Sequence, residues 1–176
     1  MIFKELTLQG AFLIKFEKKI DERGFFVRTF CKNEFQKQNL CHDFKQDSLS
    51  FNSHQGTIRG LHYQDPNSEI KLLQCLQGEI YDILVDIRKE SPTYGKWISI
   101  TLKENDVTAL YIPKGIVHGF QTLKENTLLH YKISEYYDSG SARGIRWNDP
   151  FLAIKWPLSI SQISTRDESY DDFSQL

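Results

Sequence analysis

Short segments in which apolar and polar residues alternate recur along the chain, and this pattern constrains the fold more than any other feature. From Tyr81 to Ile87 the odd-numbered residues are apolar, whereas Asp82 and Asp86 lie between them. Such alternation is typical of β-strands with two different faces. Turn-forming residues separate most of these segments. The other predicted strands are Ala11–Phe16, Phe25–Phe30, Thr57–Tyr63, Ile70–Leu76, Trp97–Leu102, Val107–Ile112, Val117–Leu123 and Thr127–Ile133.

Many short strands at this spacing predict an all-β sandwich, jelly roll or barrel. One short helix is predicted at Asn33–Asn39, with Asn33 as its cap and Phe35 facing inward. After Pro157 the alternation fades, and we expect the polar tail Ser159–Leu176 to form loops and short helical turns. The 176 residues contain no repeat or linker, so residues 1–176 are predicted to form a single domain.

Composition excludes several classes of protein. Lys and Arg number 22 against 23 Asp and Glu, a balance that provides no overall field for nucleic acid or an acidic membrane surface. The longest apolar runs, such as Ala11–Ile14, are far shorter than the ~18 residues of a membrane-spanning helix. The first residues lack the layout of a signal peptide. Three cysteines without CxxC spacing argue against a disulfide framework and favour a reduced, cytoplasmic setting.

Two segments, Arg59–Gln64 and Pro113–Phe120, each carry a histidine within a glycine-containing motif. The second segment resembles the second motif of the cupin superfamily, whose small jelly-roll barrels often hold a metal. The first metal motif of those proteins contains two histidines, but here only His62 is present, followed by Tyr63 and Gln64. A divalent metal usually needs three protein ligands. We therefore expect no metal cofactor, and His118 taken alone is consistent with a hydrogen-bonded core histidine.

A longer series of motifs is more specific, and together it resembles the family of dTDP-4-dehydrorhamnose 3,5-epimerases, which act on nucleotide 4-keto sugars without a metal. The resemblance extends from about Asp21 to Pro157 and implies a cupin-type jelly-roll barrel with one or two short helices. The motifs are Asp21–Phe26, Ile58–Gln64, Lys71–Leu72, Gly78–Asp82, Val85–Arg88, Ser91–Trp97, Ile112–Gly115, His118–Phe120 and Gly144–Pro150.

The chemistry implied by this family needs a base, a donor to an oxygen and an acid. The C4 carbonyl of the sugar acidifies the C–H bonds at C3 and C5, and the same ketone accepts the electrons, so no cofactor is needed. The resemblance implies that His62 is the base, for which an imidazole has a suitable pKa. It implies that Asp167 orients His62 and stabilises its charged form. A surface position for Asp167 remains an alternative.

The resemblance assigns the remaining catalytic roles to two strand residues. It makes Tyr131 the proton donor, although alternation places Tyr131 on the face of Leu129 and Ile133, which also suits core packing. It places Lys71 at the ketone oxygen, where an ammonium stabilises an enolate; the alternative is a solvated lysine. His118 is expected to contact the sugar or its enolate.

Arg23 and Arg59 match the family's phosphate-contacting positions, and a guanidinium suits diphosphate oxygens. The alternative for both is surface ion pairing. In an unbroken strand Arg59 and His62 would point to opposite faces, because their separation is odd. A bulge at Gly60 would bring both to one side.

The departures from the family lie around the expected nucleotide base. Arg28 replaces a usual Glu, Gln46 and Ser48 stand where Gln-x-Asn is usual, and Ala142 followed by Arg143 replaces another Glu. Tyr137 remains, and could stack on any base. An arginine fork matches O6 and N7 of guanine, and the small residues leave room for a purine. These differences predict a GDP-activated sugar, and the resemblance to family members with that specificity implies a 4-keto heptose or 6-deoxyheptose as the best single substrate.

The family resemblance also implies a homodimer that exchanges N-terminal strands, so that Arg23, Phe26 and Arg28 complete the pocket of the partner. Two other functions remain open. One is a nucleotide-sugar 3,4-ketoisomerase on the same barrel, and the other is a non-catalytic sugar-nucleotide binding protein. The presence of both His62 and Tyr131 favours the epimerase.

Overall fold

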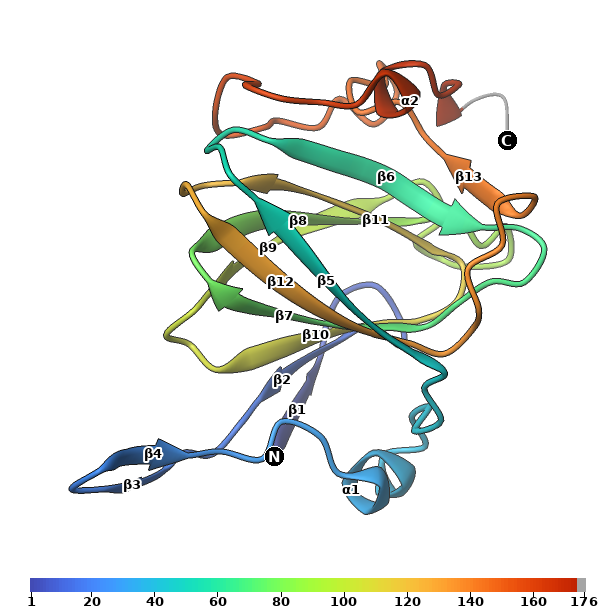
Figure 1. Cartoon of the computed structure of the whole chain (residues 1–176). Helices are drawn as coiled ribbons and strands as arrows, with labels where there is room; N and C mark the ends of the chain where they lie inside the picture. The colour runs from blue at the N-terminus through green and yellow to red at the C-terminus, as the bar shows by residue number, and fades with distance from the viewer. Residues whose placement is uncertain (174–176) are drawn as a thin grey trace.

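Two antiparallel β-sheets lie face to face in the computed structural model, which describes residues 1–173 (Figure 1). In the six-stranded sheet the order is β1 (Ile2–Glu5), β2 (Phe12–Lys15), β10 (Thr108–Ile112), β7 (Lys71–Gln77), β12 (Thr127–Ile133) and β5 (Gln46–Asn52). In the five-stranded sheet it is β13 (Ala142–Gly144), β6 (Ile58–Gln64), β11 (Ile116–Thr122), β8 (Glu79–Asp86) and β9 (Trp97–Lys103). The predicted all-β jelly-roll fold is confirmed.

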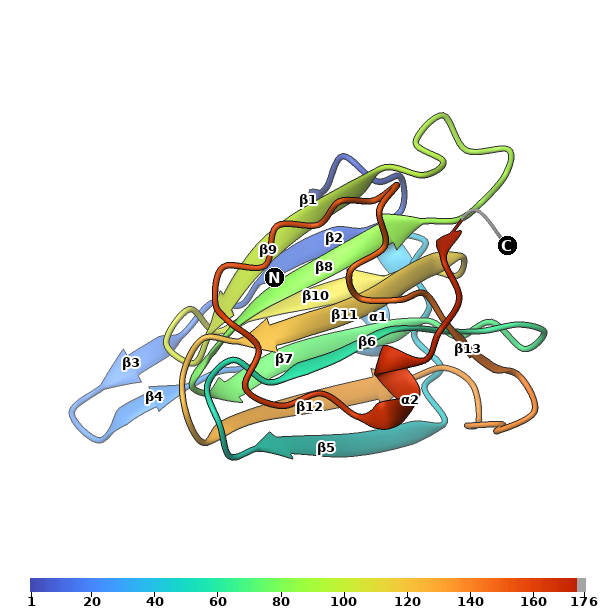
Figure 2. The same cartoon turned by 90° about the horizontal axis from the view of Figure 1, so that it is seen from above.

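The N-terminal part departs from the prediction of one strand at Phe25–Phe30. Only β4 (Gly24–Phe26) is extended there, and it pairs with β3 (Lys19–Asp21) alone. This hairpin projects from the body of the protein (Figures 1 and 2). Because neither sheet continues across it, β4 ends after three residues and the chain turns toward the first helix.

One or two short helices are predicted, and the described residues contain two. The first, α1 (Lys32–Lys37), buries Phe35 as predicted, but its cap is Cys31 rather than Asn33. Asn33 lies inside the helix, where its side chain cannot reach the unpaired amides that precede it. The second, α2 (Thr165–Glu168), is capped by the Ser164 hydroxyl, which accepts from the Asp167 amide. The tail prediction is thus confirmed as far as residue 173, and residues 174–176 lie outside the described part.

Apolar clusters pack between the sheets and on both outer faces. The inner cluster includes Leu73, Leu84 and Phe120. On the outer face of the five-stranded sheet, the C-terminal segment packs side chains such as Ile145 and Leu152 against the strands (Figure 1). The third cluster, with Phe35 and Tyr111, joins α1 to the six-stranded sheet. No helix of residues 1–173 is long and apolar enough to cross a membrane.

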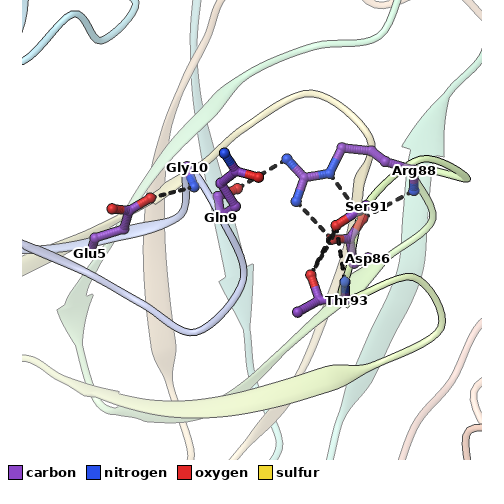
Figure 3. A network of polar contacts seen from close by, with 7 residues as sticks. All are labelled: Glu5, Gln9, Gly10, Asp86, Arg88, Ser91 and Thr93. Atoms are coloured by element: carbon purple, nitrogen blue, oxygen red, sulfur yellow. Dashed lines mark hydrogen bonds and ion pairs between the residues drawn. The ribbon is translucent and has the colours of Figure 1, made fainter.

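A polar network fixes the loop that follows β8 (Figure 3). The Asp86 carboxylate accepts hydrogen bonds from Arg88, Ser91 and Thr93. Arg88 also donates to the backbone carbonyl of Gln9, at 3.0 Å, in the turn between β1 and β2. Burial alone would raise the pKa of Asp86, but these donors hold it well below its usual value. The network therefore ties the β8–β9 loop to the N-terminal hairpin of the sheet.

Candidate active site

An irregularity in β6 brings two predicted site residues to the same side of the strand. His62 lies opposite His118 and Arg59 opposite Phe120, so β6 has one residue more than β11 over this stretch. Gly60 lies inside it with φ of +116°, and a Cβ there would come within 2.7 Å of the Gly119 Cα. The predicted bulge is confirmed. As a result Arg59 and His62 line one hollow of about 390 Å³, next to Asp167.

The imidazole of His62 is held by a carboxylate from the C-terminal segment. Nε2 of His62 lies 2.7 Å from Oδ1 of Asp167, and Oδ2 of Asp167 accepts from the Gly60 amide at 3.1 Å. Figure 2 shows α2, which carries Asp167, lying over β6. Burial would raise the pKa of Asp167, but the hydrogen bonds with His62 and Gly60 lower it below its ordinary value. Asp167 is buried, so the alternative of a surface acid is wrong.

A cavity of about 260 Å³ opens beside His62, between the two sheets. It gathers five of the predicted residues from strands and loops that are far apart in the sequence. These are His62, Lys71, Gln46, Tyr137 and Arg143. The rest of its lining is Tyr63, Gln64, Glu69, Ile133, Ala142, Arg166 and Tyr170.

Lys71 lies in this cavity as half of an ion pair. Its Nζ lies 2.8 Å from Oε1 of Glu69, and the two side chains are only 13% and 7% exposed. The alternative of a solvated strand lysine is therefore wrong. The sequence reasoning missed Glu69, although its spacing of two residues from Lys71 would have placed both side chains on one face of an extended segment.

Tyr131 and His118 are not among the residues that line this cavity. Tyr131 packs against the inner cluster, and burial raises the pKa of its phenol, which keeps the hydroxyl protonated. The rings of Tyr131 and His118 are 6.0 Å apart. His118 Nε2 lies 2.8 Å from Oδ2 of Asp82, which was not predicted. Burial raises the pKa of Asp82 despite the attraction of His118.

Three predicted residues lie in or just after the projecting hairpin, away from this cavity. Arg23 and Phe26 belong to the projecting hairpin, where Arg23 pairs with Asp21 at 2.6 Å. Arg28 follows the hairpin and pairs with Glu34 at 2.5 Å. Within a single chain, these side chains do not contribute to the lining of the cavity.

The other predicted contacts lie on strands around the cavity. Ser48 on β5 is paired with Tyr131 on β12, so both side chains face the space between the sheets. Gln46 accepts from the Tyr137 amide at 2.8 Å and so fixes the start of the loop that carries Tyr137. Arg59 donates to the Asn52 side chain at 2.7 Å. The binding roles of these residues stay predictions.

Arg166 and Tyr170 also line the cavity, and the sequence did not predict them. Arg166 donates to the Tyr137 hydroxyl at 3.4 Å, and its guanidinium lies 5.7 Å from the centre of the Tyr170 ring. Both residues flank Asp167, but no periodic pattern in the tail indicated their direction. Among residues 1–173 there is no group of three or more His, Cys, Asp or Glu side chains arranged to hold a metal ion.

Comparison with known proteins agrees with this geometry over almost the whole chain. The family model described as dTDP-4-dehydrorhamnose 3,5-epimerase matches residues 5–175. A Sinorhizobium fredii protein of that name is 37% identical over 178 residues, which cover 100% of this chain and 91% of the relative. A Methanothermobacter thermautotrophicus protein with the same name is 39% identical over 96% of this chain and 92% of its own length.

Solved structures of such proteins share the fold. The Bacillus anthracis enzyme with TDP and PPi bound superposes with a TM-score of 0.94 at 38% identity, over 98% of this chain and 99% of that one. The Legionella pneumophila enzyme in complex with dTDP-4-keto-L-rhamnose gives a TM-score of 0.92 at 35% identity, over 98% and 93% of the two chains. The similarity therefore includes every strand that lines the cavity.

Proposed function

The chain belongs to the dTDP-4-dehydrorhamnose 3,5-epimerase family and is an isomerase, and on this premise we propose that it epimerises C3, C5 or both carbons of a nucleoside-diphosphate-activated 4-keto sugar. One observation carries the proposal. The His62–Asp167 pair comes from the five-stranded sheet and the tail, whereas Lys71 and Tyr131 come from the opposite sheet. A sugar between the sheets would meet a base on one side and an acid on the other.

The reaction follows from these groups. His62 removes the proton from the carbon next to the ketone, and the electrons of that C–H bond move to the C4 oxygen. Asp167 stabilises the imidazolium that forms, and the Lys71 ammonium stabilises the enolate. Tyr131, which burial keeps protonated, returns a proton to the same carbon from the opposite side. The configuration at that carbon is then inverted, and His62 loses its extra proton to water while Tyr131 regains one from water, which restores both groups.

Deuterium wash-in tests this function. The enzyme is incubated in deuterated water with a nucleotide 4-keto sugar, and NMR follows deuterium at C3 and C5. Incorporation together with inversion supports the epimerase. A carbonyl that moves to C3 would identify a ketoisomerase instead. Binding without any incorporation would identify a non-catalytic sugar-nucleotide binding protein.

The identity of the nucleotide is a separate part of the proposal. Relatives are named for dTDP sugars, whereas the preference for a GDP-activated sugar, and for a heptose, stays a prediction from Arg28, Ser48 and Ala142. Arg28 is engaged by Glu34, so its fork must leave that ion pair before it can meet guanine. Values of kcat/KM for dTDP- and GDP-activated 4-keto sugars decide the point. A tenfold advantage of dTDP, about 1.4 kcal/mol, would contradict the GDP prediction.

We also propose a homodimer in which the β3–β4 hairpin reaches the partner's cavity. Large apolar side chains are exposed on the hairpin (Ile20, Phe25 and Phe26) and on the outer face of β5 and β7 (Leu49, Phe51 and Leu76). Such patches are typical of surfaces that a partner covers. Arg23 and Arg28 would then be delivered to the neighbouring site, which explains their distance from the cavity of their own chain.

Subunit complementation tests the shared site. His62→Asn and Arg23→Ala proteins are unfolded, mixed and refolded together. If Arg23 serves the partner, each mixed dimer contains one intact site, and the mixture recovers about a quarter of wild-type activity. Recovery would fail if Arg23 served its own chain, and a monomer by light scattering would overturn the dimer.

A cytoplasmic location completes the proposal. Cys31, Cys41 and Cys75 are all free thiols in the described structure. Free thiols fit a reducing compartment. Fractionation of cells that produce the protein tests this location, and recovery in an oxidising compartment would contradict it.

A further inference from the structure

The Tyr170 ring occupies a slot beside the candidate base. Its centre is 5.9 Å from the centre of the His62 imidazole, in an edge-to-face arrangement. Gly144 on β13 is paired with His62 on β6, and a methyl group at Gly144 would overlap the Tyr170 ring. The ring therefore fills the space that the missing side chain of Gly144 leaves next to His62.

The ring of Tyr170, rather than its hydroxyl, makes the specific contacts. Arg166 lies over the ring face at 5.7 Å. The hydroxyl oxygen is buried and forms no hydrogen bond of regular geometry among residues 1–173, but the nearby Arg166 guanidinium acts on it and opposes the effect of burial on its pKa. A buried hydroxyl without a regular hydrogen bond gains little from its position. What the position requires is thus an aromatic ring of this size.

His62 needs such a neighbour because its hydrogen bond fixes only one atom. Asp167 holds Nε2, but the terminal torsion of a histidine has a broad preference, so the ring plane can still turn about that contact. The His62 side chain is 41% exposed, so the strands alone do not confine it. An edge-to-face contact with Tyr170 restricts this rotation of the imidazole.

We propose that Tyr170 is a positioning residue, which holds the plane of the His62 imidazole in the orientation for proton abstraction. This inference rests on the proposed epimerase function. Displacing a catalytic group by about 1 Å can cost 10²-fold in rate. Loss of the ring should therefore lower kcat by about 10- to 100-fold and change KM little. Loss of the hydroxyl alone leaves the ring in place and should therefore lower kcat less than loss of the ring does.

A double-mutant cycle with Gly144 tests the proposal. Tyr170→Ala and Gly144→Ala should each lower kcat, the second by pushing the ring away, and Tyr170→Phe, which keeps the ring, should recover most of the activity that Tyr170→Ala loses. Tyr170→Ala empties the slot. Adding Gly144→Ala to this variant should therefore lower log kcat by less than half of the amount that Gly144→Ala lowers it in the wild-type protein. Thermal melts identify any variant that fails to fold, and Tyr170→Leu then replaces Tyr170→Ala with the same expectation of a lower kcat.

Three results would overturn the role of Tyr170. Additive effects in the cycle would show that Gly144 and Tyr170 act separately. A raised KM with unchanged kcat would make Tyr170 a substrate contact. Tyr170→Phe as impaired as Tyr170→Ala would assign the role to the hydroxyl. By contrast, a wild-type protein without deuterium wash-in would overturn the epimerase function itself.

Discussion

Two carboxylate–imidazole pairs lie side by side in this barrel, and their surroundings differ. His62 and His118 are direct partners on neighbouring strands, and the distances to Asp167 and Asp82 are nearly equal, at 2.7 and 2.8 Å. The His62 side chain, however, is 41% exposed, whereas that of His118 is 5% exposed. Asp167 comes from the distant C-terminal segment, and Asp82 comes from the adjacent strand β8.

Their environments shift the pKa values of the two carboxyl groups in opposite directions. Donors from His62 and Gly60 outweigh burial and lower the pKa of Asp167, while complete burial raises that of Asp82. A carboxylate that is stabilised as an anion can support an imidazolium during proton transfer. The comparison teaches that equal hydrogen-bond lengths do not indicate equal function. Access to the cavity and stability of the anion support the proposal that His62, rather than His118, is the base.

Replacement of the base should have the largest effect. His62→Asn keeps polarity at the site but removes the proton acceptor, so exchange at both carbons should fall on the order of 10²–10⁴ or more. Nucleotide affinity should remain nearly unchanged, because the phosphate contacts are expected from Arg23 and Arg59. Deuterium wash-in and nucleotide titration measure the two quantities. Exchange at the wild-type rate would remove His62 from its role.

The two carboxylates provide the next test. Asp167→Asn is expected to lower kcat on the order of 10²–10³, because an amide neither selects the same tautomer nor stabilises an imidazolium. Asp82→Asn is the matched control. Burial already disfavours its anion, so a neutral side chain of equal size should lower kcat by less than about tenfold. Equal losses in the two variants would mean that the pairs do not differ in function.

Tyr131→Phe should give a partial loss that separates exchange from inversion. The variant keeps the ring in the inner cluster and lacks only the hydroxyl, so His62 can still remove the proton. Deuterium should enter from the side of the base while full inversion slows, with water as a weaker donor. NMR of the product at C3 and C5 distinguishes these events. Full epimerisation by the variant would assign Tyr131 to packing alone.

The two carboxyl groups should change the pH dependence of the free energy of unfolding in opposite directions. The lowered pKa of Asp167 contributes stability above the ordinary Asp pKa, and this stability is lost as pH falls through the folded-state value. The raised pKa of Asp82 contributes stability at low pH, which is lost as pH rises through its folded-state value. Asp167→Asn should therefore flatten the loss of stability that occurs as pH falls below the ordinary Asp pKa of 3.8, and Asp82→Asn should steepen the loss that occurs as pH falls toward that value.

Urea unfolding at several pH values measures this difference, and each unit of pKa difference corresponds to about 1.4 kcal/mol. Asp86→Asn is a useful reference, because the pKa of Asp86 is also lowered and its network is far from His62 in the sequence. It should behave like Asp167→Asn in stability and leave deuterium exchange unchanged. The same slope of unfolding free energy against pH in all three variants would contradict the assigned pKa directions.

Chelation should have the smallest effect. The mechanism places the enolate against Lys71 and uses only protein side chains, so prolonged dialysis against a chelator should leave activity unchanged. Activity that is lost on chelation and restored by a divalent ion would instead establish a metal-dependent reaction. Magnesium-free and zinc-supplemented samples of the same preparation provide the comparison.

The sequence predicted the strands that carry ordered motifs, because alternation and glycine turns are local properties. It also predicted the bulge at Gly60, since the odd separation of Arg59 and His62 required one. It missed β5, whose Leu49 faces outward and whose Ser48 faces the space between the sheets. That arrangement reverses the usual pattern of an exposed polar face and a buried apolar face, and the reversal follows from the cavity.

The unpredicted site residues depend on long-range geometry. Arg166 and Tyr170 reach the cavity because the tail crosses the outer face of the five-stranded sheet (Figure 1), a path that no local pattern specifies. Asp82 was read as one polar residue of an alternating strand, and only the barrel brings it to His118. Glu69 precedes β7 in a segment without regular structure, and its spacing of two residues from Lys71 was the one local signal that their side chains share a face.

The separation of 105 residues between His62 and Asp167 has a consequence for the newly made chain. At a synthesis rate of about 5–20 residues per second, roughly 5–20 s pass between the two residues. All strands from β1 to β12 precede residue 134, so both sheets except β13 can be assembled during that interval. A nascent barrel at this stage contains His62 but does not yet contain Asp167. Proton transfer is therefore the last property that the molecule acquires, after its shape.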